Sequence, residues 1–334
     1  MDAKGVGLME NGPEGTPVLR QMARRNLGPR TLGRRADRRT RDGWPGRHGS
    51  GRPPEIGRPG HYGSGRPFEI GRPPIWDPAA GPPESHEHQR RGALLTEVFA
   101  HRGSAQLARE NTVAAFRAAK ALGADGIELD VHLSADGALV VHHDAELPGQ
   151  GPIADLSSGE LPDWLPSLTE ALDASRPLQV NIEIKSEPGT WTQRDHLLAS
   201  KVAELALSRE EVDRFVVSSF SLAAVDAVHG RAPRIATALL IGPAESALEA
   251  LATAHDRGHR GLHPFFPVVD ETLVSAAKAV GIAIRPWTVD DPRLIAALAR
   301  IGVDAVITND VTAALGALGR SQPGGHGHVP HRLP

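Results

Sequence analysis

The stretch GIELDVHLSADGALVVHHD, residues 126–144, decides the fold expected for this chain. Two apolar runs rich in β-branched residues flank a Ser-Ala-Asp-Gly turn signal, which predicts strand, turn, strand. Alternate side chains of a strand share a face, so Glu128 and Asp130 project together. If the strands pair about the centre of the turn, Glu128 lies opposite His143. This arrangement indicates either a solvated strand face or a site for a hard divalent cation with acid–base chemistry.

Length and composition bound the class of protein. A chain of 334 residues allows one large domain or two small ones. The sequence contains no Cys, which excludes disulfides and thiolate chemistry. No run approaches the roughly 18 apolar residues of a membrane span, and the first residues lack the apolar core of a signal peptide. We therefore expect a cytoplasmic protein without a transmembrane segment.

Charge and composition change near residue 92. Residues 1–92 contain 17 Lys and Arg against 10 Asp and Glu, a net charge of +7, whereas the remainder has a net charge of −10. The same segment holds 17 of the 36 Gly and 13 of the 28 Pro, and residues 49–59 are nearly repeated at 63–73. Such a composition cannot bury enough apolar surface to offset chain entropy. We predict that 1–92 is a disordered Gly/Pro/Arg-rich tail.

The composition of this tail allows three interpretations. Its arginines can contact nucleic acid or acidic lipid, but they are sparse and lack interleaved aromatic residues. We therefore favour a solvated tail and expect no nucleic-acid partner. An over-extended reading frame is the third interpretation. The predicted organisation is a tail over 1–92, a barrel domain over 93–320 and a disordered C-terminal tail over 321–334.

Beyond the tail, the apolar pattern alternates between strand and helix signals. Strand patterns cover residues 94–100, 126–132, 139–144, 178–185, 214–220, 236–241, 261–264, 282–288 and 304–308. Helices are expected between them, with caps such as Asn111 and the Ser167–Glu170 capping box. About eight βα units in roughly 230 residues predict an α/β fold, the (β/α)₈ TIM barrel. Since nine strand patterns compete for eight places, one arm of the 126–144 hairpin is surplus.

An open doubly wound sheet is the alternative fold. Against it, no Gly-x-Gly-x-x-Gly fingerprint follows the first strand pattern. The sequence also lacks a Gly-x-x-x-x-Gly-Lys-Ser/Thr loop, so nucleotide hydrolysis has no support.

Polar residues at the C-terminal ends of barrel strands converge on one mouth. The candidates there are His101, Arg102, Glu128, Asp130, His143, Glu183, Lys185, Ser219, His263 and Trp287. The carboxylates Glu128, Asp130 and Glu183 can hold Mg²⁺ or Ca²⁺, whereas zinc is disfavoured without Cys or an HExxH helix. Histidines can act as base and acid, and Arg102 and Lys185 supply charge for phosphate oxygens. These groups suit phosphodiester cleavage.

Several motifs resemble the glycerophosphodiester phosphodiesterase family in order and spacing. They are His101-Arg102-Gly103, Glu110-Asn111-Thr112, Ile127-Glu128-Leu129-Asp130-Val131, Val140-Val141-His142-His143-Asp144 and Asn181-Ile182-Glu183-Ile184-Lys185, followed by Val217–Phe220, Trp287–Asp290 and Ile307–Asp310. The likeness covers roughly residues 95–315, and the family has the (β/α)₈ barrel that the periodicity already predicts. Family membership implies a phosphoric diester hydrolase.

The resemblance implies metal-dependent hydrolysis of glycerophosphodiesters to sn-glycerol 3-phosphate and an alcohol, with Mg²⁺ or Ca²⁺ as cofactor. The family's functional residues carry over to catalytic His101 and His143, metal-binding Glu128, Asp130 and Glu183, and substrate-binding Arg102, Lys185 and Trp287. It also implies that one histidine activates a glycerol hydroxyl of the substrate, giving a cyclic phosphate that water opens. We expect His132 and His142 to lie at the surface or around the site rather than to act in catalysis.

The segment between Leu147 and Pro166 departs from the family, because many members carry a longer insertion there. A shorter cover predicts a more open mouth that can admit a lipid tail. The alternative functions are therefore a lysophospholipase D-like phosphodiesterase on the same barrel, with a lysophospholipid as substrate, and a catalytically silent binding module.

A chain beginning at Leu94 should unfold cooperatively and keep the rate constant of the full chain, because 1–92 offers no apolar core. Thermal denaturation and a phosphodiesterase assay of both chains check this. Aggregation or loss of activity would make the tail part of the folded domain.

Overall fold

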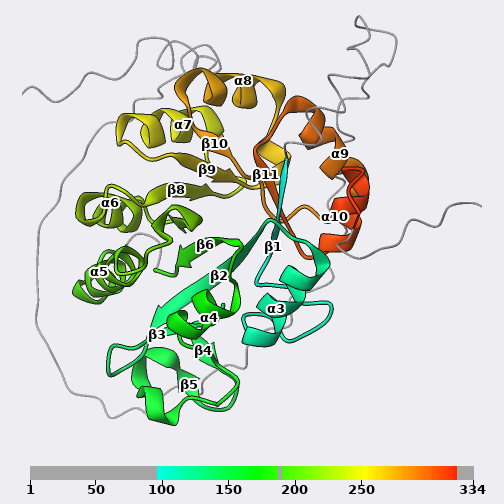
Figure 1. Cartoon of the computed structure of the whole chain (residues 1–334). Coiled ribbons are helices and arrows are strands. Elements are labelled where there is room, and N and C mark those ends of the chain that lie inside the picture. Colours follow the sequence, from blue (N-terminus) through cyan, green and yellow to red (C-terminus); the bar gives the residue numbers. More distant parts are fainter. Residues whose placement is uncertain (1–95, 187–189, 322–334) are drawn as a thin grey trace, which may run out of the picture. The chain divides into compact units, whose positions relative to one another are not determined.

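The computed structural model describes residues 96–186 and 190–321. The predicted tails, 1–92 and 321–334, lie outside this part apart from Ser321. Strands and helices alternate along the described chain, and helices surround a central set of parallel strands (Figure 1).

Eight strands belong to the barrel and three lie beside it. The barrel strands are β1 (Glu97–Ala100), β2 (Gly126–Leu133), β6 (Gln179–Ile184), β7 (Phe215–Ser219), β8 (Ala236–Ile241), β9 (Gly261–Pro264), β10 (Ala283–Ile284) and β11 (Ala305–Thr308). The others are β3 (Leu139–Val141), β4 (Glu146–Leu147) and β5 (Gly151–Pro152).

The helices follow the strands in turn. They are α3 (Val113–Leu122), α4 (Leu168–Ala174), α5 (Gln193–Leu207), α6 (Leu222–Arg231), α7 (Ala247–Asp256), α8 (Glu271–Val280), α9 (Pro292–Ile301) and α10 (Val311–Ala317). Four short 3₁₀ turns complete the described elements: η1 (Ile153–Asp155), η2 (Ser158–Glu160), η3 (Val212–Arg214) and η4 (Phe266–Val268).

The strand order around the sheet is β10, β9, β8, β7, β6, β2, β1, β11, with parallel pairing throughout. Backbone hydrogen bonds connect the two ends of this path. The Ile307 N–H donates to the Pro286 carbonyl at 2.9 Å, and the Val289 N–H donates to the Ile307 carbonyl at 2.9 Å. The predicted (β/α)₈ barrel is therefore confirmed, and the open doubly wound alternative is wrong.

The hairpin that decides the fold is divided between barrel and exterior. Strand β2 pairs with β1 and β6 inside the barrel, whereas β3 is the surplus arm: among the described strands it pairs with β2 alone, and Val140 forms one further bridge with Ser167. Val131 lies opposite Val141, one residue away from the predicted register, so Glu128 does not pair with His143. The cause is Gly137, whose φ of +81° places an additional left-handed residue after the tight turn.

Residues between β3 and α4 build a small unit with its own core. The β4–β5 hairpin is followed by η1 and η2, and Val140, Leu147, Ile153 and Leu165 are buried against one another. This is the segment that the sequence identifies as a shortened cover, and Figure 1 shows it beside the barrel, around the β4 and β5 labels.

The N-cap of helix α3 differs from the predicted one. Thr112, not Asn111, is its N-cap, because the Thr112 hydroxyl accepts the Ala115 N–H. Asn111 has a φ of +55° and turns its side chain elsewhere. The predicted capping box of α4 is confirmed, with Ser167 and Glu170 satisfying each other's backbone N–H groups.

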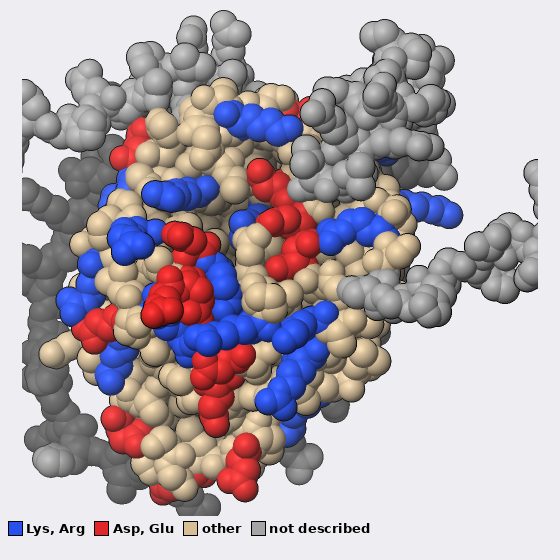
Figure 2. Space-filling view, viewed as in Figure 1, with Lys and Arg blue, Asp and Glu red and all other residues tan. Residues whose placement is uncertain are grey.

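Basic and acidic side chains are interspersed on the face shown in Figure 2. The ion pairs of the described residues include Arg209 with Asp173 at 2.7 Å and Arg257 with Asp226 at 2.6 Å. Among the helices described, none has the length and apolar character needed to cross a membrane.

The interior of the barrel requires glycine at the start of β2. A Cβ on Gly126 would lie 2.4 Å from the Phe99 ring, which is itself fully buried. Gly126→Ala should therefore lower the free energy of unfolding by about 1–3 kcal/mol through overpacking. Denaturant unfolding measures the loss. Gly159→Ala is the matched control, because no atom lies within 4 Å of its added Cβ; equal stability of the two variants would contradict this account.

Candidate active site

Three buried carboxylates lie together at the C-terminal ends of two adjacent strands. Glu128 and Asp130 alternate along β2, and Glu183 on β6 is the register partner of Asp130. One oxygen of each carboxylate lies within 4.8 Å of the others. Their exposed fractions are only 3 %, 1 % and 8 %, respectively. Burying three acids in one place is costly unless cations, hydrogen bonds or protons compensate.

Two cationic side chains supply part of that compensation. Lys185 Nζ lies 2.8 Å from Asp130 Oδ1 and 2.6 Å from Glu183 Oε1. Arg102 Nε lies 3.5 Å from Asp130 Oδ2, and its Nη1 lies 3.0 Å from Glu110 Oε1. Arg102 has a φ of +55°, which is a strained conformation for a residue other than glycine. The strained turn after β1 directs its side chain across the mouth of the barrel.

The pKa values of the carboxyls follow from this uneven compensation. Burial raises the pKa of Glu128 well above its usual range, and the charges of Asp130 and Glu183 raise it further. Burial likewise raises the pKa of Glu183 to about 7, although Lys185 opposes the shift. For Asp130, burial is outweighed by Lys185 and by hydrogen bonds from Lys185 and Asn111, so its pKa is lowered.

Glu128 is the least compensated of the three acids. Its Oε2 accepts the Arg102 backbone N–H at 3.0 Å. Its Oε1 is buried and has no hydrogen-bond partner among the residues described. An orphaned buried carboxylate oxygen beside two further carboxylates is the donor set that a hard divalent cation prefers. The residues present therefore fit such an ion.

His101 follows β1 and is held in one orientation. Its Nδ1 lies 2.7 Å from Asn309 Oδ1, and Asn309 is itself oriented by donating from Nδ2 to Asp290 at 2.9 Å. Because the amide oxygen accepts, Nδ1 carries the proton and Nε2 is left with a lone pair. That Nε2 lies 4.0 Å from Glu128 Oε2. Burial, together with the charge of Arg102, lowers the pKa of His101 and favours the neutral ring.

His143 lies on the loop after β3, and its side chain is 36 % exposed. Its Nδ1 lies 2.7 Å from Asp144 Oδ1, which can only accept when ionised. This hydrogen bond lowers the pKa of Asp144. The partner of His143 is thus a carboxylate, in contrast to the neutral amide that faces His101.

A cavity of about 240 Å³ brings these groups to one opening. Its lining residues are His101, Arg102, Glu128, His143, Glu183, Lys185, Phe220, Trp287 and Ile307. Seven of the eight residues predicted for the site are among them. The eighth, Asp130, lies beneath, covered by its contacts with Lys185 and Arg102.

One wall of this cavity is apolar. Phe220 and Trp287 meet edge to face with ring centroids 5.5 Å apart, and Phe265 packs against Trp287 at 5.7 Å. The Trp287 Nε1–H donates to the His263 carbonyl at 2.8 Å, which fixes the indole. The cavity thus has a charged half that suits a phosphate and an aromatic half that suits an uncharged or organic group.

Two further candidates from the sequence do not line the cavity. Ser219 is buried and donates to the Ile184 carbonyl at 2.8 Å. His263 is fully buried in the barrel, where burial and then Arg285 hold its pKa well below the usual value. Both are parts of the barrel wall rather than of its mouth.

The structure adds residues that the sequence did not assign. Asn111 donates to Asp130 Oδ2 at 2.7 Å, and Asn309 and Asp290 orient His101. Phe220, exposed to 42 %, joins the apolar wall. These residues lie within or beside the quoted motifs, but their roles depend on contacts between strands that are distant in sequence.

Comparison with known proteins gives this barrel its class. The model of the Glycerophosphoryl diester phosphodiesterase family matches residues 101–313. The chain belongs to this family, and it is therefore a phosphoric diester hydrolase on a (β/α)₈ barrel.

Individual relatives agree with this assignment. A glycerophosphodiester phosphodiesterase of Caldanaerobacter subterraneus subsp. tengcongensis is 33 % identical over 242 residues, covering 65 % of this chain and 95 % of the relative. A probable glycerophosphodiester phosphodiesterase 1 of Mycobacterium tuberculosis is 30 % identical, covering 62 % and 86 %.

Solved structures show the same barrel. An Oleispira antarctica phosphodiesterase in complex with the product sn-glycerol-3-phosphate is 26 % identical, with a TM-score of 0.61, covering 68 % of this chain and 98 % of that one. A glycerophosphodiester phosphodiesterase of Parabacteroides distasonis is 27 % identical with the same TM-score, covering 67 % and 97 %.

Proposed function

We propose that this protein hydrolyses glycerophosphodiesters to sn-glycerol 3-phosphate and an alcohol, using a divalent cation and two histidines. The observation that carries the proposal is the buried acidic triad, two of whose carboxylates, Glu128 and Glu183, line the same cavity as His101 and His143. Family membership and the product complex of the Oleispira antarctica relative support the substrate class.

The proposed roles of the charged residues follow from their positions. Glu128, Asp130 and Glu183 would hold Mg²⁺ or Ca²⁺, which supplies charge neutralisation to a phosphoryl oxygen when bound. Arg102 and Lys185 lie on the same cavity and bind the remaining phosphate oxygens.

The two histidines have different proposed roles in proton transfer. His101 is buried, faces a neutral amide and presents the lone pair of Nε2, so it acts as the base. His143 lies at the half-exposed lip of the cavity, where the leaving alcohol departs to solvent, and we assign it the role of the acid on that alcohol. An imidazole suits both tasks because it exchanges a proton near pH 7, whereas a carboxylate is a weak base.

The aromatic half of the cavity receives the organic part of the substrate. Phe220, Trp287 and Ile307 provide that wall. A lysophospholipase D-like activity is the second candidate, because an exposed aromatic residue, Phe220, lines the cavity and can contact a lipid tail. A catalytically silent binding module is the third, and it is disfavoured because each predicted site position keeps its functional side chain.

Purified protein should release sn-glycerol 3-phosphate from glycerophosphocholine with Mg²⁺ or Ca²⁺, and a chelator should abolish the rate. Glu128→Gln should weaken cation binding in calorimetry, because it removes a charge from the donor set. Glu146→Gln, an exposed residue on β4, is the control. Product formation in the absence of any divalent ion would contradict the metal role. A faster rate on lysophosphatidylcholine would instead establish the second candidate, and inactivity on a broad panel of diesters the third.

His101→Ala and His143→Ala should each lower kcat by about 10²–10⁴, the usual effect of removing one acid–base partner. Both variants should bind Ca²⁺ as the unmodified protein does, because neither histidine belongs to the acidic triad. A 4-nitrophenyl ester of glycerol 3-phosphate needs no acid for its departure. It should therefore restore the rate of His143→Ala and not that of His101→Ala; equal restoration of both would refute the division of roles.

A further inference from the structure

The loop that carries His143 leaves β3 at Val141 and has no strand pairing of its own. Two hydrogen bonds connect it to β2. The His142 N–H donates to the Asp130 carbonyl at 3.0 Å, and His132 Nε2 lies 3.1 Å from the His143 carbonyl. A carbonyl can only accept, so His132 Nε2 is the donor in the second bond. The backbone of His143 is thus held by an imidazole outside the catalytic cavity.

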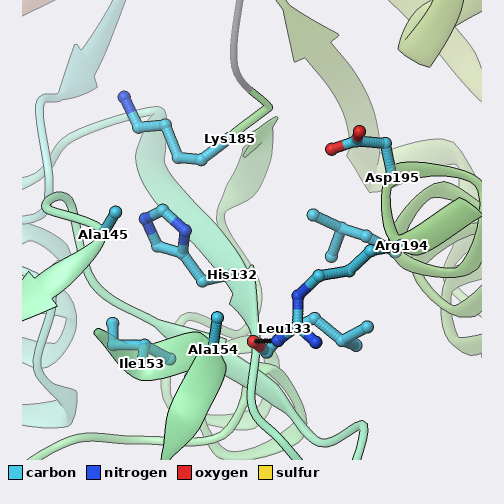
Figure 3. A pocket seen from close by; sticks show the side chains of 9 residues that line it. His132, Leu133, Ala145, Ile153, Ala154, Lys185, Arg194 and Asp195 are labelled. Atoms are coloured by element: carbon cyan, nitrogen blue, oxygen red, sulfur yellow. Dashed lines mark hydrogen bonds between the residues drawn. The ribbon is translucent and has the colours of Figure 1, made fainter. Parts of the chain in front are cut away.

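The position of His132 allows it to hold the His143 loop but not to contact a substrate. Its side chain is the third on the face of β2 that carries Glu128 and Asp130, and it lies beyond the barrel mouth. Its ring lines a second cavity, of about 80 Å³. In Figure 3 the ring lies between Lys185 on one side and Ala145 and Ile153 on the other. Because its ring does not line the catalytic cavity, His132 makes no contact there with a substrate.

The strand end beneath His132 is anchored independently. Arg194 reaches from α5 to the carbonyls of Leu133 and Ser134, the latter at 3.0 Å, as the dashed contact to Leu133 in Figure 3 illustrates. This contact ties β2 to a helix just after His132. The imidazole therefore projects from a fixed backbone, as a rigid positioning group must.

We propose that His132 is a positioning residue that fixes His143 through the hydrogen bond from Nε2 to the His143 carbonyl. The proposal rests on the proposed acid role of His143 and adds that this role depends on a group on the metal-binding strand. A displacement of about 1 Å at a reacting group can cost about 10²-fold in rate, so one backbone hydrogen bond is sufficient to matter.

Two replacements separate the hydrogen bond from the volume of the side chain. His132→Met fills similar space without a donor, whereas the amide nitrogen of His132→Gln reaches the place of Nε2. We expect His132→Met to lower kcat about 10- to 100-fold with KM unchanged, and His132→Gln to recover most of the loss. His196→Met, at an exposed position on α5, controls for the exchange of residue type. Equal losses in the Met and Gln variants would overturn the proposal.

A double-mutant cycle distinguishes positioning from general support of the fold. With His143→Ala already present, His132→Met should cause no further fall in kcat, because the group that it positions is gone. Additive losses would refute a role exercised through His143. Calorimetric Ca²⁺ binding by His132→Met should equal that of the unmodified protein, and weaker binding would show that β2 itself had been disturbed.

Hydrogen exchange tests the anchor without any assay of turnover. Peptides covering 142–145 should exchange faster in His132→Met than in the unmodified protein or in His132→Gln, because the loop loses one of its two bonds to β2. Unchanged exchange would overturn the proposal. If the unmodified protein failed to cleave any diester while exchange still rose, the proposed function would fail and the anchor would stand.

Discussion

The site depends on the cost of burying three carboxylates side by side. Glu128, Asp130 and Glu183 are nearly inaccessible to solvent, and an unpaired buried charge is far more costly than an exposed one. Lys185 and Asn111 compensate Asp130, whereas Glu128 keeps an oxygen without a partner among the described residues. The charge that is still missing is positive, and both a divalent cation and the protons implied by the raised pKa values of two of the acids can supply it.

The same constraint favours histidines, each with a different partner, as the proposed proton-transfer groups. Near a buried negative cluster and an anionic diester, a further carboxylate would be raised in pKa and would resist ionisation. Imidazoles avoid this cost because the form that accepts a proton is neutral, whereas that of a carboxyl group is an anion. Asn309 gives His101 a neutral partner deep in the mouth, whereas Asp144 gives His143 an ionic partner at the exposed lip. The two rings therefore have partners of different charge.

Much of the fold could be predicted because strand alternation is local. The spacing of Glu128 and Asp130 predicts that both lie on one face, and the number of βα units predicts the (β/α)₈ barrel rather than the open doubly wound alternative. The register of β3 could not be predicted from the turn signal alone, since the positive φ of Gly137 adds a residue to the turn. The sequence predicts a helix cap at Asn111 because Asn is a good cap, whereas the tertiary contact with Asp130 shows its other use. Likewise, the orientation of His101 by Asn309 joins residues 208 positions apart.

Strand β2 also connects the acidic triad with the loop that carries His143. Strand β2 has eight residues, whereas β1 has four. The last residues of β2 extend beyond the barrel. The part inside the barrel presents the two carboxylates, and the extension pairs with β3 and directs His132 to the His143 loop. A parallel barrel closes with strands much shorter than this one. The extra length therefore serves the mouth rather than the barrel, since it fixes the distance between the acidic triad and the proposed acid along a single rigid element.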